Sequence, residues 1–347
     1  MMKKDSRPTL APSGTSPWIR FEPPLLPQRG TLDRLLATAL PGTTARHIEF
    51  LERGVVNSNY RVDLIPASTD QPKQVRLRLT RRPEATGREA ALTTRLLAAH
   101  PGLVARPLAF ESCVEPEAHI ASLWTWIEGA TLEEMSLDAG AEESLGDELA
   151  AALHDVHGET VEGFGRLKAD LRVADAPGFD RPALRWLDDL ARRIAVRLEN
   201  PAHGLAPDAL SPLKLAVARA MAPLWSVPST SGSLVHGDLS AGNILVSLQD
   251  GRPRLAGLID WEMCRSADPA VDAASAEFEL STRWPILAKR LSENLRAQTP
   301  DNWDRRFDLA AVPLLLDARM VALVRHSAPL TERVDARLAA MATRWSN

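Results

Sequence analysis

Cysteine is scarce in this chain of 347 residues, which contains only Cys113 and Cys264. Two thiols are too few for a disulfide framework or for a metal site built from several cysteines. Their scarcity indicates a reducing compartment, so we expect a cytoplasmic protein with two structural thiols.

Long apolar runs are also missing. Even residues 309–324 are interrupted by proline and by charged residues, whereas a membrane-spanning helix needs about 20 mainly apolar residues in a row. Residues 7–27 are rich in Pro, Ser, Thr and Gly and contain no apolar core of a signal peptide. We therefore expect no membrane partner, and we expect residues 1–30 to form a flexible tail.

Neither sign of charge dominates. The chain carries 41 Lys and Arg against 45 Asp and Glu, which gives a formal net charge of -4 and a pI near 6.1. Surfaces that bind nucleic acid are typically basic, so we expect no nucleic-acid partner. The apolar content of 45% is ordinary for a globular protein, and the length allows two lobes. Nothing in the sequence indicates an oligomeric state.

The most informative stretch is residues 234–246, with the sequence LVHGDLSAGNILV, which is soon followed by LIDWE at residues 258–262. Apolar residues at both ends of the first stretch predict a strand that enters a loop and a strand that leaves it. The pair Asp250-Gly251 is a hairpin turn signal. We therefore expect residues 255–259 to return as a partner strand.

Two carboxylates and one carboxamide stand at the ends of these predicted strands. The hairpin brings Asn243 and Asp260 together, with Asp238 five residues before Asn243 on the loop. Mg²⁺ prefers oxygen ligands and usually keeps waters and substrate phosphates, and a nearby carboxylate can accept the proton of an attacking hydroxyl. An isolated Asp or Asn often only caps a turn. The combined spacing favours phosphoryl transfer over this alternative.

These residues resemble the motifs of the aminoglycoside phosphotransferase and choline kinase-like family, whose members are small-molecule relatives of the protein kinases. His236-Gly237-Asp238 stands where protein kinases have His-Arg-Asp, and residues 259–262 stand where they have Asp-Phe-Gly. The resemblance implies Asp238 as the catalytic base, Asn243 and Asp260 as Mg²⁺ ligands, and ATP as the phosphoryl donor. It is specific for the superfamily and leaves open the acceptor and the choice between ATP and GTP.

The resemblance also implies an α+β fold of the two-lobed protein-kinase-like type, with a small antiparallel-sheet N-lobe and a mainly helical C-lobe. We expect the nucleotide-binding N-lobe at residues 31–127. We expect the C-lobe, which carries the catalytic residues and the acceptor site, at residues 128–347.

A small polar loop in the expected N-lobe is a candidate phosphate-binding element. Residues 54–60 join a strand at residues 47–51 to a strand with alternating apolar residues from Tyr60 onward. Backbone N–H groups of such a loop can hold ATP phosphates, although a plain hairpin turn is the alternative. The resemblance favours ATP binding, with Ser58 and Asn59 as contact residues.

Two arginines alternate with apolar residues in the strand at residues 75–79. One interpretation is a solvated sheet edge. In the other, implied by the resemblance, Arg78 contacts the ATP phosphates in place of the kinase lysine, with Arg76 as the candidate if the register is shifted by two. The partner of Arg78 would then be Glu89.

Glu89 follows Thr86 by three residues and also matches a capping box at the start of a helix. Leu92 and Leu96 follow Glu89 by three and seven residues, so the carboxylate lies on the core-facing side of that helix. A buried carboxylate needs a partner, which favours the pair with Arg78.

Residues 124–127, with the sequence WTWI, correspond by resemblance to the hinge between the lobes. Backbone groups there, around Trp126, would meet the adenine. Core packing is the alternative role of the two tryptophan side chains.

The acceptor is less well indicated. Residues 133–148 contain seven acidic residues and no Lys or Arg, which is usually a solvated face but would suit a cationic acceptor. We expect an aminoglycoside or another hydroxylated antibiotic as the acceptor. The alternatives are a kinase of a metabolite such as choline, homoserine or a sugar derivative, and a nucleotide-binding pseudokinase that acts as an interaction module. We further expect His154 to be a hydrogen-bonded structural residue and Asp272 to tie down the catalytic loop.

Overall fold

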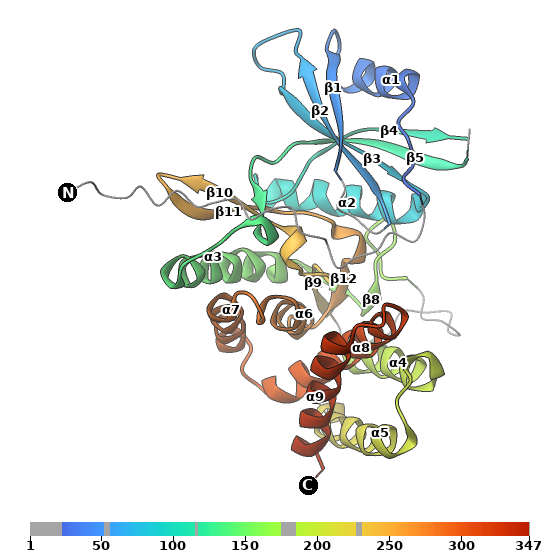
Figure 1. Cartoon of the computed structure of the whole chain (residues 1–347), viewed down its shortest axis with the longest axis vertical. Coiled ribbons are helices and arrows are strands. Elements are labelled where there is room, and N and C mark those ends of the chain that lie inside the picture. Colours follow the sequence, from blue (N-terminus) through green and yellow to red (C-terminus); the bar gives the residue numbers. More distant parts are fainter. Residues whose placement is uncertain (1–22, 52–55, 115–116, 175–184, 227–230, 347) are drawn as a thin grey trace, which may run out of the picture. The chain divides into compact units, whose positions relative to one another are not determined.

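The computed structural model describes residues 23–51, 56–114, 117–174, 185–226 and 231–346 (Figure 1). Most of the predicted N-terminal tail, residues 1–22, lies outside these ranges. The chain divides into two compact units, each built from separate stretches of sequence. The first unit contains Met1–Ala141, Lys168–Leu171 and Ala241–Glu262, and the second contains Glu142–Leu167, Arg172–Ser240 and Met263–Asn347. The predicted lobe boundary at residues 127 and 128 stays a prediction.

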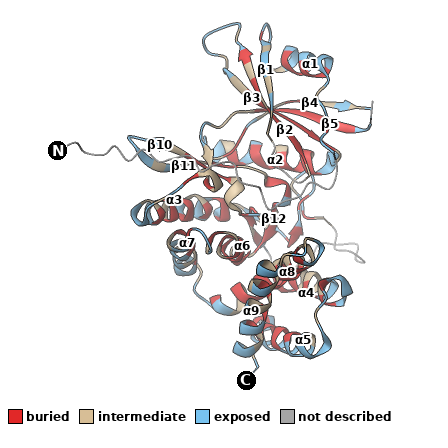
Figure 2. Ribbon diagram, in the orientation of Figure 1, coloured by how far each residue is buried: buried red, intermediate tan, exposed pale blue. Residues whose placement is uncertain are grey.

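An antiparallel sheet with the strand order β1-β2-β3-β5-β4 forms most of the first unit. Its strands are β1 (Thr44–Leu51), β2 (Ser58–Ile65), β3 (Gln74–Thr80), β4 (Pro107–Cys113) and β5 (His119–Thr125), accompanied by the helices α1 (Arg29–Ala39) and α2 (Pro83–Ala99) (Figure 1). Buried and partly exposed residues alternate along β2, with Tyr60, Val62 and Leu64 buried. This alternation confirms the predicted strand. Leu32, Leu35 and Leu36 of α1 join these side chains in one apolar core (Figure 2).

The predicted hairpin is also present in the first unit. It consists of β10 (Ile244–Gln249) and β11 (Arg252–Leu258), and β10 pairs on its other side with β6 (Ala130–Thr131). Asp250 and Gly251 both have positive φ angles, 51° and 76°, as expected for the turn type that matches the twist of a two-residue hairpin. The hairpin places Asp260 just beyond the end of β11.

The second unit combines a small sheet with a set of helices. The sheet has the order β7-β9-β12-β8, and its strands are β7 (Thr160–Glu162), β8 (Gly165–Arg166), β9 (Ser231–Val235) and β12 (Arg265–Ala267). The helices are most of α3 (Ala139–Gly158), then α4 (Trp186–Glu199), α5 (Pro207–Met221), α6 (Ala270–Leu280), α7 (Pro285–Gln298), α8 (Trp303–Val324) and α9 (Ala328–Arg344). Short 3-10 helices span Leu132–Glu134, Pro201–His203, Ala222–Ser226, Ala241–Asn243 and Trp261–Met263. None of the helices in the described ranges is long and apolar enough to cross a bilayer.

Two helices differ from the sequence prediction. The α2 helix begins at Pro83, and the Thr86 side chain bonds the carbonyl of Arg82 within the first turn. The capping-box role of Glu89 is therefore wrong, because Glu89 lies in the second turn of the helix. Helix α5 was not predicted. Its internal Pro212 is a signal for a helix break in a sequence, although Pro207 at its first position is compatible with a helix start.

Leu184, Leu187, Leu190 and Ile194 stand at helical spacing in the sequence and predict a helix over residues 181–198. It is observed as α4 from Trp186 onward. Its predicted first residues, 181–184, lie outside the described ranges. Both cysteines are free thiols, Cys264 buried and Cys113 partly buried, as expected for structural thiols.

Candidate active site

In the second unit, the loop that carries Asp238 follows directly after β9. The β9 strand pairs with β12, with Val235 opposite Arg265 and Leu234 opposite Ser266. The Asp238 side chain is exposed and the neighbouring Leu239 is buried. The loop therefore presents a carboxylate to solvent from an anchored backbone.

Asp272 holds this loop by its backbone. One carboxylate oxygen, Oδ2, accepts the His236 N–H at 2.9 Å, and the other, Oδ1, accepts the Gly237 N–H at 2.8 Å. This confirms the predicted role of Asp272. His157, to which the sequence assigned no role, completes the arrangement with its Nε2 atom 3.0 Å from Oδ2.

The environment favours the charged form of Asp272. Burial alone raises the pKa of its carboxyl group, but the hydrogen bond and charge of His157, the charge of His236 and the Gly237 N–H outweigh burial. The pKa of Asp272 is therefore held below its ordinary value, and the loop is anchored by a carboxylate.

His236 and Ser275 fix the next two residues of the loop. The Asp238 N–H donates to Nδ1 of the buried His236 at 3.3 Å, and the Leu239 N–H donates to Ser275 Oγ at 3.1 Å. His236 therefore braces the loop, as expected from the sequence. His154 bonds Gln298 at 2.8 Å, which confirms it as a hydrogen-bonded residue.

In the first unit, Asn243 and Asp260 lie at the open end of the β10–β11 hairpin. Ile244 is opposite Leu258 in the register, and the Ile259 N–H donates to the Asn243 carbonyl at 3.0 Å. Asp260 has a φ of 66°, a left-handed conformation that costs an ordinary residue free energy and is common at functional sites.

The residues at this end of the hairpin fit Mg²⁺ better than a metal held by protein ligands alone. Among the described residues, no three His, Cys, Asp or Glu side chains form a metal-binding group. An amide and a carboxylate, Asn243 and Asp260, instead offer the few oxygen ligands that Mg²⁺ needs when waters and phosphates supply the rest. The Asp260 side chain is 36% exposed and so remains accessible.

Arg78 is the centre of a buried ion-pair network in the same unit. Its Nη1 lies 2.5 Å from Glu89 Oε2, and its Nη2 lies 3.1 Å from Asp260 Oδ1 and 2.8 Å from Glu262 Oε2. Burial lowers the pKa of Arg78, but the charges of Glu89, Asp260 and Glu262 outweigh burial and raise it above its ordinary value. Burial raises the pKa of Glu89 more than Arg78 lowers it. The structure thus brings Arg78, Glu89 and Asp260 together.

Arg76 occupies a different environment from Arg78. Its Nη2 lies 3.9 Å from Glu89 Oε1, and its guanidinium lies over the Trp124 ring, 5.3 Å from the ring centroid. Both arginines are buried, so the interpretation of this strand as a solvated edge is wrong. Arg78 makes the close contact with Glu89.

Glu262 is a member of the network to which the sequence assigned no role. Its Oε2 also accepts the Asn57 side-chain N–H at 3.0 Å, and its Oε1 lies 3.6 Å from Nη1 of Arg82. Its backbone carbonyl accepts from Arg88 at 2.8 Å. The only signal in the sequence was its place two residues after Asp260.

Ser58 and Asn59 lie in β2 and not in the preceding loop. The strand begins at Ser58, whose buried hydroxyl accepts the Leu25 N–H at 2.9 Å. Asn59 is opposite Arg78 in the register, which places it beside the ion-pair network. The expected loop position of these two residues is therefore wrong, and residues 52–55 of that loop lie outside the described ranges.

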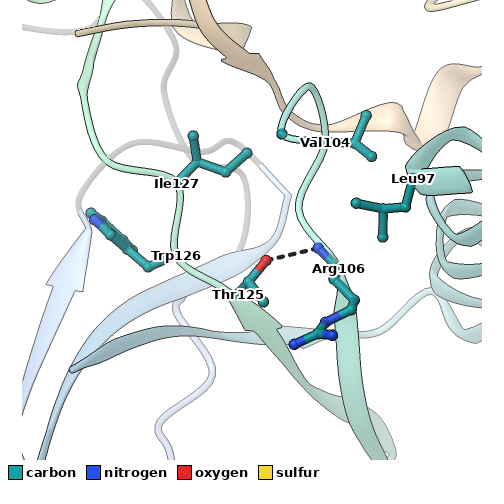
Figure 3. A pocket seen from close by; sticks show the side chains of 7 residues that line it. Leu97, Val104, Arg106, Thr125, Trp126 and Ile127 are labelled. Carbon is teal, nitrogen blue, oxygen red and sulfur yellow. Dashed lines mark hydrogen bonds between the residues drawn. The ribbon is translucent and has the colours of Figure 1, made fainter. Parts of the chain in front are cut away.

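Trp126 follows directly after β5 and lines a shallow cavity of about 370 Å³ (Figure 3). The other lining residues are Leu97, Gly102, Val104, Arg106, Thr125 and Ile127. In Figure 3 the side chains of Leu97 and Val104 lie on one side of the residue 125–127 segment and the Trp126 side chain lies on the other. The buried Trp124, by contrast, packs in the core and donates to Ser122 Oγ at 2.9 Å.

A family model described as the phosphotransferase enzyme family matches residues 47–306. This match begins within β1 and includes the Arg78 network, the Asp238 loop and the hairpin. The chain belongs to the phosphotransferase enzyme family. It is accordingly an enzyme, and the membership confirms the resemblance noted from its motifs.

Among curated proteins, this phosphotransferase is similar to viomycin phosphotransferase from Streptomyces vinaceus, with 40% identity over 57 residues. The matched segment is 16% of this chain and 20% of that relative. The shared part is therefore a fifth of the relative's length.

Solved structures show the fold over nearly the whole phosphotransferase. Aminoglycoside phosphotransferase APH(4)-Ia aligns with a TM-score of 0.66 and 16% identity, over 91% of this chain and 99% of that chain. Aminoglycoside 2'-phosphotransferase-IIIa, solved with GDP, aligns with a TM-score of 0.61 and 14% identity, over 92% and 99% of the two chains. The likeness confirms the predicted fold class, an α+β fold of the protein-kinase-like type.

Proposed function

We propose that this phosphotransferase transfers the γ-phosphoryl group of ATP to a hydroxyl group of a small molecule in the cytoplasm. The observation that supports this most is the buried Arg78, held by Glu89 and bonded to Asp260. Glu89 holds the Nη1 group of this buried arginine, and its Nη2 group bonds the partly exposed Asp260 carboxylate. A guanidinium held in this way suits the binding of phosphate oxygens.

Each of the remaining site residues has a proposed task. Asp238 orients the acceptor hydroxyl and accepts its proton as the oxygen attacks. Asn243 and Asp260 would hold Mg²⁺, which when bound would neutralise charge on the phosphates. Arg78, kept in place by Glu89, contacts the α- and β-phosphates.

The remaining nucleotide contacts come from the first unit. Ser58 and Asn59 lie at the start of β2, where the backbone can approach the phosphates. The backbone around Trp126 meets the adenine. Asp272 and His157 act on the reaction only through the loop that they hold.

A hydroxylated antibiotic, and an aminoglycoside first among these, is the proposed acceptor. Support comes from viomycin phosphotransferase as a relative and from the likeness to aminoglycoside phosphotransferases, one of which was solved with AMP-PNP and hygromycin B.

A metabolite kinase is the second candidate, because the acidic segment at residues 133–148 supports a cationic antibiotic less than its charge alone suggests. Four of its carboxylates form structural contacts. Glu134 caps Thr131, Asp138 accepts the Ala141 N–H, Glu142 accepts the first N–H groups of α7, and Asp147 pairs with Arg290. Carboxylates engaged in this way give no particular support for a cationic acceptor. A pseudokinase is the weaker alternative, because Asp238, Asn243 and Asp260 are all present.

A panel of acceptors tests this proposal. Purified protein with Mg²⁺-ATP is incubated with aminoglycosides, other hydroxylated antibiotics, choline, homoserine and sugars, and ADP release is measured. We expect one class to raise ADP release well above the acceptor-free level, and chelation of Mg²⁺ to abolish the increase. Absence of both nucleotide binding and turnover would contradict the proposal, and nucleotide binding without turnover of any acceptor would favour the pseudokinase.

A further inference from the structure

Four arginines of the second unit are close enough to affect one another's charge, and one of them lies on β12, which pairs with the strand that leads into the Asp238 loop. They are Arg166 on β8, Arg265 on β12, and Arg193 and Arg197 on α4. Arg265 is opposite Arg166 on one side of β12 and opposite Val235 on the other. We refer to these four residues as the arginine cluster.

Two carboxylates neutralise only part of the arginine cluster. The Oδ2 atom of Asp189 lies 3.2 Å from Nη2 of Arg265, and the Oδ2 atom of Asp317 lies 2.6 Å from Nη2 of Arg197. Within the described part of the chain, Arg166 and Arg193 have no ion-pair partner. The Nη1 atom of Arg193 and the Nε atom of Arg265 are buried and, within the same ranges, have no hydrogen-bond acceptor.

The electrostatics of the cluster agree with a surplus of positive charge. Burial and then the charge of Arg265 lower the pKa of Arg193 to about 9, against the opposite effect of Asp189. Burial lowers the pKa of Arg265 as well, and Arg197 and Arg166 lower it further while Asp189 raises it. Arginine side chains stay protonated in proteins, so both groups are cations. They repel each other, and an anion between them would relieve that repulsion.

The arginine cluster lies within reach of the catalytic loop. Val235, opposite Arg265, precedes Asp238 by three residues. Three residues of chain span at most about 11 Å, and paired residues on neighbouring strands lie about 5 Å apart. The backbone of Arg265 is therefore within about 16 Å of the backbone of Asp238, a distance that one small molecule with a polar group at each end can span.

We propose that Arg166, Arg193 and Arg265 bind an anionic group, a carboxylate or a phosphate, on the acceptor molecule. This inference rests on the proposed function, because it concerns the acceptor of the Asp238 reaction. Within that function it favours the metabolite candidate, since an aminoglycoside carries amino groups and neither a carboxylate nor a phosphate. Guanidinium groups bind carboxylate and phosphate oxygens through paired N–H donors, and the buried unpartnered donors of Arg193 and Arg265 supply such groups. Arg197 does not take part, since Asp317 occupies it.

Thermal unfolding with sodium sulfate as the probe tests the site without any need for turnover. The variants are Arg193→Gln and Arg166→Gln, and the matched control is Arg219→Gln, the same change of charge at an exposed position on α5. At constant ionic strength we expect sulfate to raise the melting temperature of the wild type and the control more than that of the two variants. Equal sulfate shifts in all four proteins would overturn the site.

The same measurement without any ligand separates binding from a structural role. Because Arg193 is repelled by its neighbours, we expect Arg193→Gln to melt at or above the wild-type temperature. A clear decrease, with an unchanged response to sulfate, would show that Arg193 stabilises the fold and does not bind an anion.

Gluconate, glucose and glucosamine then distinguish an acceptor group from a free anion, because they share a polyol frame and differ in charge. We expect gluconate to stabilise the wild type more than the other two, and the difference to disappear in Arg193→Gln. Sulfate binding without any preference for gluconate would indicate a free-anion site and overturn the acceptor assignment. A parallel titration with ADP tests the proposed function separately, since its failure would leave the anion site intact.

Discussion

The carboxylate of Asp272 accepts N–H groups that lie 36 and 35 residues before it in the chain. Those two bonds and the contact with His157 fix the backbone immediately before Asp238. A carboxylate with several donors in a buried site contributes more to stability than an exposed one, because removing it leaves the donors without a partner.

Replacement of Asp272 by Asn is expected to lower the free energy of unfolding by about 3 kcal/mol at pH 7, since a buried charged acceptor is lost. The pKa of Asp272 is lower in the folded protein, so its stabilisation is complete above the unfolded-state pKa of about 3.9 and is lost as the pH falls through the folded-state value. The difference between wild type and variant should therefore shrink below about pH 4.

Urea unfolding between pH 3 and pH 7 measures this difference. Asp304→Asn, at a half-exposed position of α8, serves as the control and should change stability little. A difference between wild type and Asp272→Asn that is independent of pH would contradict the account of Asp272.

Single residues also show where prediction from sequence succeeds and where it fails. The approach of Arg78 to Glu89 could be predicted because the family resemblance implied the pair and the spacing of Leu92 and Leu96 places Glu89 on the core-facing side of its helix. Glu262 and His157 were missed because their partners are distant in the chain. Glu262 bonds residues 205 and 184 positions away, and His157 bonds one 115 positions away. No local pattern records such contacts.

The turn that enters the catalytic loop depends on Gly237. This residue has a φ of 80°, and a Cβ atom there would lie 2.6 Å from the Met263 carbonyl oxygen. Gly251, in the β10–β11 turn, has a φ of 76° and no atom within 4 Å of such a Cβ. Replacing Gly251 therefore tests backbone strain alone, whereas replacing Gly237 tests backbone strain together with a steric clash.

Gly237→Ala is expected to lower stability by about 3 kcal/mol, the sum of backbone strain and overpacking. Gly251→Ala should cost about 1 kcal/mol, because only the strain applies. Equilibrium unfolding in urea compares the two variants. Equal losses would show that the contact with Met263 does not matter.

Helix α7 begins at a carboxylate from α3. Glu142 Oε2 accepts the N–H groups of Ile286 and Leu287 at 2.9 and 3.1 Å, which satisfies donors that the helix itself leaves free. Glu142→Ala should therefore cost about 2 kcal/mol of stability. The neighbouring exposed Glu143→Ala should change it by less than about 0.5 kcal/mol. Thermal or urea unfolding of both variants measures these two losses of stability. A Glu142 variant as stable as the Glu143 variant would contradict the capping role.

Among the elements, those with strong local signals could be predicted. Alternation indicated β2 and β3, and Asp250-Gly251 indicated the hairpin. The start of α2 was misplaced because Thr86 and Glu89 imitate a capping box, whereas Pro83 supplies the actual first residue. Helix α5 was missed because Pro212, which lies inside it, suggests a break.

For the molecule as a whole, family membership and fold are established, whereas the phosphoryl donor, the acceptor and the roles of the site residues are proposals. The likeness to APH(4)-Ia covers 91% of the chain at 16% identity, a level that preserves a fold and leaves the acceptor site free to differ. The arginine cluster and the engaged acidic segment are two features of this chain to test. Folds carry many functions, so the acceptor has to be found from the site.

The central claim is that Asp238 acts on the acceptor hydroxyl while the nucleotide is held by other residues. The most direct measurement compares the wild type with Asp238→Ala for turnover, using the acceptor with the highest ADP release, and for ADP affinity. We expect kcat to fall by about 10²- to 10⁴-fold, the usual contribution of a general base, with the ADP dissociation constant unchanged within about twofold. Undiminished turnover in Asp238→Ala would contradict the account.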